Sequence, residues 1–267
     1  MIISLLTDYG YDDEFVGVCH AVIRSIRPGV PIVDVTHGIE RHDVREGAIV
    51  LRNALPYLPV GVHVAVVDPQ VGTERRGVAV RCADDRILVG PDNGVLSLAW
   101  ERAGGAVEAV DISRSPFRLE PVSATFHGRD VFAPVGARLV AGAGLLEAGE
   151  PLNVAELTVL RLPTPSVDSG VASSHAILID RYGNVSLNLG HAELLGLGVT
   201  MGSRVRVVAG GSDSEARVVQ TFADVGEGDL LLYEDAWSSL ALAVNRGDAS
   251  TELGIDVDDE VRISPIQ

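Results

Sequence analysis

Residues 66–76 read Val-Val-Asp-Pro-Gln-Val-Gly-Thr-Glu-Arg-Arg, a buried strand that runs into a polar turn. The apolar run ends at Asp68, the chain then turns at Pro69 and Gly72, and the turn presents a hydroxyl and two guanidinium groups. In an open α/β sheet, ligands bind beyond the carboxyl ends of the strands, so Asp68 holds a position typical of a functional group. An aspartate that caps its own turn beside solvated arginines fits the segment as well, so the interpretation depends on the rest of the chain.

The sequence around this segment alternates between apolar runs typical of strands and amphipathic runs typical of helices. Expected strands lie at residues 2–6, 31–35, 62–68, 77–82, 86–90 and 107–110. The first helix should be capped by Asp12 or Asp13 and end near Arg27, a second should span about 43–55, and others should follow residues 94 and 130. Strands separated by helices predict a mostly parallel α/β sandwich with its polar loops at one edge of the sheet.

The pattern changes at residues 162–170, where Pro, Ser and Gly indicate a linker. Short β-rich runs follow at residues 175–180, 184–189, 203–209, 215–220, 229–233 and 260–265. Regular short strands separated by turns indicate a small antiparallel barrel or sandwich. We therefore expect an N-terminal α/β domain at residues 1–164 and a smaller C-terminal β domain at residues 165–267.

The composition limits the classes of partner. Lys and Arg number 21 against 37 acidic residues, a formal net charge of -16, so neither nucleic acid nor an anionic membrane surface is an expected partner. A small cationic or zwitterionic substrate suits this field better. No apolar run reaches the roughly 18 residues of a membrane span, no signal peptide is recognisable, and Cys19 and Cys82 lack disulfide or metal spacing, so we expect a cytoplasmic protein.

Common catalytic signatures are missing from the sequence. It contains no phosphate-binding G-x-x-x-x-G-K, no dinucleotide-binding G-x-G-x-x-G after a strand and no G-x-S-x-G of serine hydrolases. No H-E-x-x-H or H-x-H pair suggests a metal site, so no metal is expected.

Seven motifs occur in an order that identifies a family resemblance. They are Thr7-Asp8-Tyr9-Gly10, Asp13-x-Phe15-Val16-Gly17, Asp68-Pro69-x-Val71-Gly72-Thr73-x-Arg75, Gly90-Pro91-Asp92-Asn93-Gly94, Thr125-Phe126-His127-Gly128-Arg129-Asp130, Ile179-Asp180-x-Tyr182-Gly183-Asn184 and Ala243-Val244-Asn245-Arg246-Gly247. The chain resembles the S-adenosyl-L-methionine (SAM) hydroxide adenosyltransferases, which are adenosine-forming SAM hydrolases related to fluorinase and chlorinase. The resemblance spans nearly the whole chain.

The resemblance implies a fold, an assembly and a reaction. It implies an α/β domain followed by a C-terminal β-barrel, and a homotrimer that binds substrate between one subunit's large domain and its neighbour's small one. It also implies cleavage of SAM to adenosine and L-methionine, with SAM as the substrate and no cofactor. The catalytic positions of the family fall on Asp68, Arg75 and His127, and either Asp68 or His127 could take the proton from water.

The resemblance also assigns substrate contacts by position. Asp8 matches the carboxylate that holds the ribose hydroxyls, and Asp13 and Asp180 match positions near the methionine amino group. The aromatic residues that match walls of the adenosine site are Phe126, Tyr182 and Phe222. Asn184 and Asn245 match side chains near the adenine edge. One position departs from the pattern, because His42 stands where fluorinase has a tryptophan, which puts its role as a wall residue in doubt.

Two other functions use a similar pocket. A halide-dependent enzyme is disfavoured, because the halogenating relatives have Tyr in place of Asp68 and halide-contacting Thr and Ser in place of Val71 and Gly128. A non-catalytic adenosine or SAM sensor would need the ribose and adenine contacts alone. It would have no reason to keep an acid, a guanidinium and an imidazole beside C5′.

Overall fold

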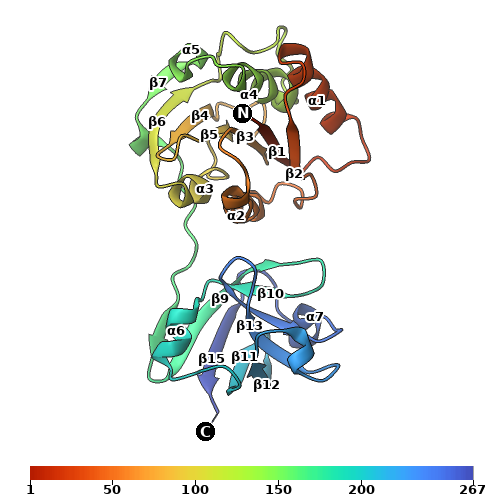
Figure 1. Cartoon of the computed structure of the whole chain (residues 1–267), viewed down its shortest axis with the longest axis vertical. Coiled ribbons are helices and arrows are strands. Elements are labelled where there is room, and N and C mark those ends of the chain that lie inside the picture. The colour runs from red at the N-terminus through yellow and green to blue at the C-terminus, as the bar shows by residue number, and fades with distance from the viewer. Residues whose placement is uncertain (267) are drawn as a thin grey trace. The chain divides into compact units, whose positions relative to one another are not determined.

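The computed structural model describes residues 1–266 of the chain, which divides into two compact units, Met1–Leu160 and Arg161–Gln267 (Figure 1). Each unit has its own buried apolar core. Among residues 1–266, no helix combines the length and the apolar character needed to cross a bilayer.

In the described part of the first unit, seven strands form one sheet in the order β2-β1-β3-β5-β4-β6-β7. They are β1 Ile3–Thr7, β2 Ile32–Thr36, β3 Val62–Val66, β4 Gly77–Cys82, β5 Ile87–Pro91, β6 Ala106–Asp111 and β7 Glu150–Leu152. The first four strands in this order are parallel, and β4, β6 and β7 continue the sheet antiparallel. The carboxyl ends of β1, β2 and β3 therefore share an edge, and the polar turns predicted from the sequence follow them there.

Helices cover both faces of this sheet. They are α1 Phe15–Ile26, α2 Val44–Ala54, α3 Ser97–Arg102, α4 Ala133–Val140 and the short α5 Leu145–Ala148. Figure 1 shows α1 with α4 on one side of the sheet and α2 with α3 on the other. The predicted apolar stripe consists of Val131 and, within α4, Val135 and Leu139, and it is buried in the core that α1 also faces.

The start of α1 differs from the prediction. The residue before the helix is Glu14, which makes no side-chain capping hydrogen bond, so the expected cap at Asp12 or Asp13 is wrong. Residues 8–13 instead run past a pocket that Asp8 and Asp13 both line. In contrast, α2 has a side-chain cap, because Oδ1 of Asp43 accepts a hydrogen bond from the backbone N–H of Glu46 at 2.8 Å.

The second unit is a closed β-barrel of seven strands within the described residues. Its strands are β9 Val171–Ile179, β10 Val185–Leu187, β11 Arg204–Ala209, β12 Ser212–Val218, β13 Leu230–Glu234, β14 Leu240–Val244 and β15 Glu260–Pro265. They pair in the order β10-β14-β13-β12-β11-β15-β9, and β9 pairs back onto β10. All of these pairings are antiparallel except β12 with β13. The predicted α/β class with a C-terminal β-barrel is thus confirmed.

Smaller elements complete the second unit. Strand β8, Ser166–Asp168, pairs with β9, so part of the expected linker at residues 162–170 is a strand. Two short helices lie between barrel strands in the sequence. They are α6, His191–Gly196, which follows β10, and α7, Ala249–Leu253, which follows β14. Strand β14 was missed by the sequence prediction, because its five residues are all buried and show no alternation of apolar and polar side chains.

Candidate active site

A cavity of about 270 Å³ lies beyond the carboxyl ends of β1 and β3. Four separate segments of the first unit supply its lining, namely the turn after β1, the loop before α2, the turn after β3 and the segment before α4. The lining residues are Asp8, Tyr9, Asp13, Phe15, Arg41, His42, Val66, Asp68, Val71, Thr125, Phe126, His127 and Gly128.

The three predicted catalytic side chains are in contact, and two of them, Asp68 and His127, line this cavity. Nε of Arg75 donates to both carboxylate oxygens of Asp68, at 2.9 and 3.0 Å, and its Nη2 also donates to Oδ2. The same Nη2 lies 2.8 Å from Nδ1 of His127. Arg75 therefore joins Asp68 and His127, which are 59 positions apart in the sequence.

This geometry fixes the tautomer of His127. A guanidinium only donates hydrogen bonds, so Nδ1 of His127 accepts from Arg75, and the neutral ring carries its proton on Nε2. Burial, followed by the charge of Arg75, lowers the pKa of His127 below its ordinary value. The imidazole is therefore neutral at pH 7.

Local packing holds the two chain segments together. The side chains of Asp68 and Arg75 are each 6% exposed, and the guanidinium carbon of Arg75 lies 5.3 Å from the centroid of the Phe132 ring. Gly72, at φ +81, allows the turn after β3 to approach residue 124 so closely that a Cβ would overlap the Ala124 carbonyl oxygen. A π-helical turn at Gly128–Phe132 then leads from His127 into α4.

Tyr9 is a pocket residue that the sequence analysis did not single out. A Cβ on Gly128 would overlap the Tyr9 hydroxyl, so the glycine makes room for that group. Burial, and to a smaller degree the neighbouring Cys19, Asp8 and Asp68, raise the pKa of Tyr9 well above its ordinary value, so its hydroxyl stays protonated. Its position between Asp8 and Gly10, just past a strand end, was a usable signal.

The remaining predicted residues of the first unit also line the cavity. Oδ2 of Asp8 accepts a hydrogen bond at 3.0 Å from the backbone N–H of His42, a residue with a positive φ of 67. Phe126 packs edge-on against Phe15, with ring centroids 5.0 Å apart. Asp13 and His42 border the same space. Phe15, Arg41 and Thr125 line it too, although the sequence analysis gave them no role.

The other five predicted substrate residues belong to the second unit. Oδ1 of Asp180 accepts hydrogen bonds from the backbone N–H groups of Tyr182 and Asn184, and its Oδ2 accepts from Nδ2 of Asn184 at 2.8 Å. Phe222 is 40% exposed and packs against Tyr233, and the Tyr182 side chain is 70% exposed. Nδ2 of Asn245 donates to the carbonyl groups of Val225 and Gly226. Two large aromatic side chains are thus presented at the surface of this unit.

The part of the chain described here, residues 1–266, contains a group of potential metal ligands. In that range one set of three His, Cys, Asp or Glu side chains has its ligand atoms close together: His20, Asp34 and His37. These residues lie outside the lining of the cavity described above.

Comparison with known proteins gives a single family. The family model described as "SAM hydroxide adenosyltransferase N-terminal domain" matches residues 3–149, and the one for the C-terminal domain matches residues 174–262. A protein of Salinispora tropica named (R)-S-adenosyl-L-methionine hydrolase is 43% identical over 98% of this chain and 97% of its own length. A Thermus thermophilus protein of the same name is 37% identical over 98% of both chains. A fluorinase of an Actinoplanes species is 32% identical over 91% of both.

Two solved structures are similar to this chain over nearly its whole length. The crystal structure of an uncharacterized conserved protein from Thermotoga maritima matches with a TM-score of 0.93 and 37% identity, covering 98% of this chain and 100% of that one. A conserved hypothetical protein from Thermus thermophilus matches with a TM-score of 0.78 and 35% identity, covering 98% and 99%. The predicted family resemblance is confirmed, and the chain belongs to the SAM hydroxide adenosyltransferase family.

Proposed function

We propose that this protein hydrolyses SAM to adenosine and L-methionine by in-line attack of water on C5′. The observation that carries the proposal is the contact of Asp68, Arg75 and His127 at a cavity of about 270 Å³. Membership of the family and the names of the similar SAM hydrolases support it.

The leaving group decides which catalytic help is needed. A sulfonium departs as a neutral thioether, so the reaction needs no general acid and no metal or other cofactor. Bulk water is a poor nucleophile, so the site must hold one molecule in line with the breaking bond and accept its proton. When neutral water attacks C5′, its oxygen first becomes that of a protonated alcohol, an oxonium that is strongly acidic. A carboxylate is therefore a sufficient base late in the step.

We propose that Asp68, rather than His127, accepts the proton of the attacking water. Nδ1 of His127 already accepts from Arg75, and Nε2 carries the proton of the neutral ring, so the imidazole has no free lone pair for water. Oδ1 of Asp68 accepts from Arg75 only once and keeps a lone pair, whereas Oδ2 accepts from both Nε and Nη2. His127 then donates from Nε2 and orients the water, while Arg75 holds the acid and the imidazole in place.

Water suits the lining better than a halide. Val71 and Gly128, at the positions of the halide-contacting hydroxyls of the halogenating relatives, offer no side-chain donor. Few donors would then replace the hydration of a halide ion, whereas water has Asp68 as a hydrogen-bond acceptor.

The substrate contacts remain part of the proposal. Asp8 would hold the ribose hydroxyls, Phe126 would wall the adenosine, and Asp13 would face the methionine ammonium. We further propose a homotrimer in which a neighbouring subunit supplies Asp180, Tyr182, Asn184, Phe222 and Asn245. Cys19 and Cys82 are buried free thiols, which suits a reducing cytoplasm.

Incubation with each sulfonium epimer of SAM, followed by chromatography for adenosine, tests the reaction. The similar relatives are named for the (R) epimer, so that epimer is the first to assay. In water enriched in heavy oxygen, the label should enter adenosine and not methionine. Asp68→Asn should lose roughly 10²- to 10⁴-fold in turnover and still bind SAM.

Three outcomes would contradict the proposal. Binding without adenosine release would indicate a sensor. A halogenated nucleoside formed in concentrated chloride or fluoride would indicate a halogenase. Full turnover by Asp68→Asn would refute the assignment of the base.

A further inference from the structure

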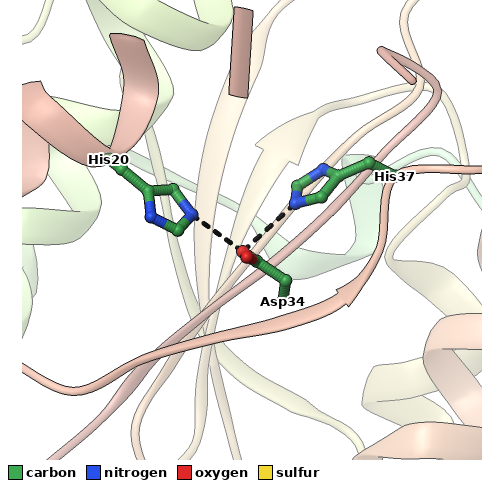
Figure 2. A group of neighbouring side chains, drawn as sticks. All are labelled: His20, Asp34 and His37. Carbon is green, nitrogen blue, oxygen red and sulfur yellow. Dashed lines mark hydrogen bonds and ion pairs between the residues drawn. The ribbon is translucent and has the colours of Figure 1, made fainter. Parts of the chain in front are cut away.

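Three potential metal ligands converge away from the catalytic cavity (Figure 2). His20 comes from α1, Asp34 from β2 and His37 from the turn after β2. Figure 2 shows both imidazole rings pointing at the same carboxylate. Nε2 of His20 lies 2.8 Å from Oδ1 of Asp34, and Nε2 of His37 lies 3.1 Å from it.

The hydrogen bonds of His37 leave one ring nitrogen unsatisfied. The side chain is fully buried, and its Nδ1 pairs with Oγ1 of Thr7 at 2.8 Å. Within the described residues, Nε2 has no hydrogen-bond partner of acceptable geometry, although it lies near Asp34. A buried polar atom without such a partner is uncommon and calls for an explanation. When Nδ1–H donates to Thr7, Nε2 presents a bare lone pair toward His20 and Asp34.

We propose that His20, Asp34 and His37 bind a divalent first-row transition cation, such as Zn²⁺, through two Nε2 atoms and one carboxylate oxygen. Two imidazoles and one carboxylate are a ligand set that such cations accept. Thr7 provides the outer hydrogen bond that orients a metal-binding histidine.

The spacing fits a cation of this size. Metal–ligand bonds of about 2.0–2.2 Å place neighbouring ligand atoms roughly 2.8–3.1 Å apart in octahedral geometry and roughly 3.3–3.6 Å apart in tetrahedral geometry. The three ligand atoms lie within 4.8 Å of one another, and the two shorter separations need to open by only a few tenths of an ångström. The side chains of His20 and Asp34 are 25% and 29% exposed, so they can adjust and water can complete the coordination.

The local charges also favour a cation. Asp34 is the one carboxylate of the group, and Nε2 of each imidazole lies within 3.1 Å of its Oδ1. The whole chain carries a formal charge of -16, which adds long-range attraction.

A bound cation would join α1 to the end of β2. It would also act on β1 through His37 and Thr7, whose Oγ1 accepts a hydrogen bond from the backbone N–H of Tyr9. Such a site would stabilise the first unit without supplying a group to the water that attacks SAM. It is therefore independent of the proposed hydrolysis.

Titration calorimetry of the full-length, chelator-treated protein with ZnCl₂ tests the site. The parent protein should bind one equivalent, and its melting temperature should rise as the concentration of free Zn²⁺ increases. His20→Gln removes one ligand from a partly exposed position and should weaken binding at least tenfold. Asp34→Asn, which keeps the side-chain shape, should weaken it in the same way. The matched control is His191→Gln, because His191 is exposed on the second unit.

Cobalt provides a second readout. Co²⁺ bound to the parent should give visible absorption bands that are altered in His20→Gln, whereas His191→Gln should match the parent. The metal-free melting temperature of each variant establishes that it folds. The proposal is overturned if the parent shows no saturable binding, if His20→Gln and Asp34→Asn bind as tightly as the parent, or if His191→Gln loses the same equivalent.

Discussion

At the scale of single residues, the proposed choice of Asp68 as the base rests on the hydrogen bond from Arg75 to His127. It makes Nδ1 an acceptor, keeps the imidazole neutral and leaves Asp68 as the group with a free lone pair. Two residues in direct contact with one guanidinium are therefore not interchangeable as bases. Their difference should appear in the pH dependence of turnover.

We expect the rate to be insensitive to pH across the ordinary range of histidine titration. Because burial and Arg75 lower the pKa of His127, the ring stays neutral as the pH falls past about 6.5 and becomes charged only at lower pH. The imidazolium would then repel Arg75 and break the contact, so adenosine release should fall there. A pH–rate profile checks this, and His127→Asn should move the acid limb to lower pH. Suppose that the parent shows an acid limb at or above pH 6.5 that is absent from His127→Asn. The pKa of His127 would then not be lowered in the folded protein.

Gly128 is expected to be intolerant of a methyl group. In Gly128→Ala the new Cβ would overlap the hydroxyl of Tyr9, whose ring is held between Phe15 and Phe126. Overpacking of this kind costs about 1–3 kcal/mol, and displacement of Tyr9 should also slow turnover. Chemical denaturation and adenosine assays measure the two effects.

Gly17 provides the control for that substitution. It lies in α1 of the same unit, and a Cβ there would meet nothing within 4 Å. Gly17→Ala should therefore be neutral in stability or raise it by up to about 1 kcal/mol. Equal stabilities for the two alanine variants would contradict the proposed clash.

At the scale of single elements, β3 carries a histidine whose titration should be visible in the stability of the fold. His63 is fully buried, its Nδ1 pairs with Oγ of Ser4 at 2.8 Å, and burial, followed by the charge of Arg86, lowers its pKa from 6.5 to about 4. Between these two values the unfolded chain binds a proton that the folded chain excludes. This contribution to stability is present above pH 6.5 and is lost as the pH falls toward 4.

Urea unfolding at pH 7 and pH 5 measures the effect. Between pH 7 and pH 5, the free energy of unfolding should fall by about 2 kcal/mol more in the parent than in His63→Gln. The glutamine can still pair with Ser4. His191→Gln, on the exposed start of α6, should keep the parental pH dependence. The same loss in His63→Gln as in the parent would show that His63 titrates normally.

The helices and strands were predictable wherever a periodic pattern of apolar residues, or a residue that commonly ends such elements, marked them. The apolar run before Asp68 gave β3, and the spacing of Val131, Val135 and Leu139 gave the buried face at the start of α4. The cap of α1 was not predictable from composition, because several acidic residues precede it and the pocket takes two of them. Strand β14 has no alternation, and continuous apolar runs are ambiguous between strand and helix.

The site was predictable to a different extent. Asp68, Arg75 and His127 were grouped by family resemblance, since no spacing rule links positions so far apart in the chain. The contact between their side chains is a tertiary property of the turn after β3 and the segment before α4. Tyr9 was missed because its hydroxyl acquires a neighbour only when Gly128 folds against it.

At the scale of the whole molecule, the proposed sharing of a site between subunits can be tested by complementation. Asp68→Asn removes a group of the first unit, and Phe222→Ala removes an aromatic wall of the second. Each variant alone should be impaired. After the two are unfolded and refolded together, about a quarter of the sites in a cyclic assembly would combine an intact first unit with an intact second unit from a neighbour.

The amount of adenosine released by the mixture is the measurement. Co-refolded protein should exceed the sum of the two variants refolded separately, and light scattering should report the mass of a trimer. If each site came from one chain, mixing would restore no activity. A monomeric mass would exclude the shared site as well.

The ring of strands in the second unit also affects how this protein behaves when it is stressed. Because β9 bonds back onto β10, the ladder of main-chain groups closes on itself and offers foreign strands little to pair with. In the first unit, the terminal strand β7 is only three residues long and has Pro151 at its centre, which makes it a poor template. Fibrous aggregation that starts from the barrel would first require one of its seams to open. The shortest pairings join β12 to β13 and β10 to β14, so strengthening these seams should delay it.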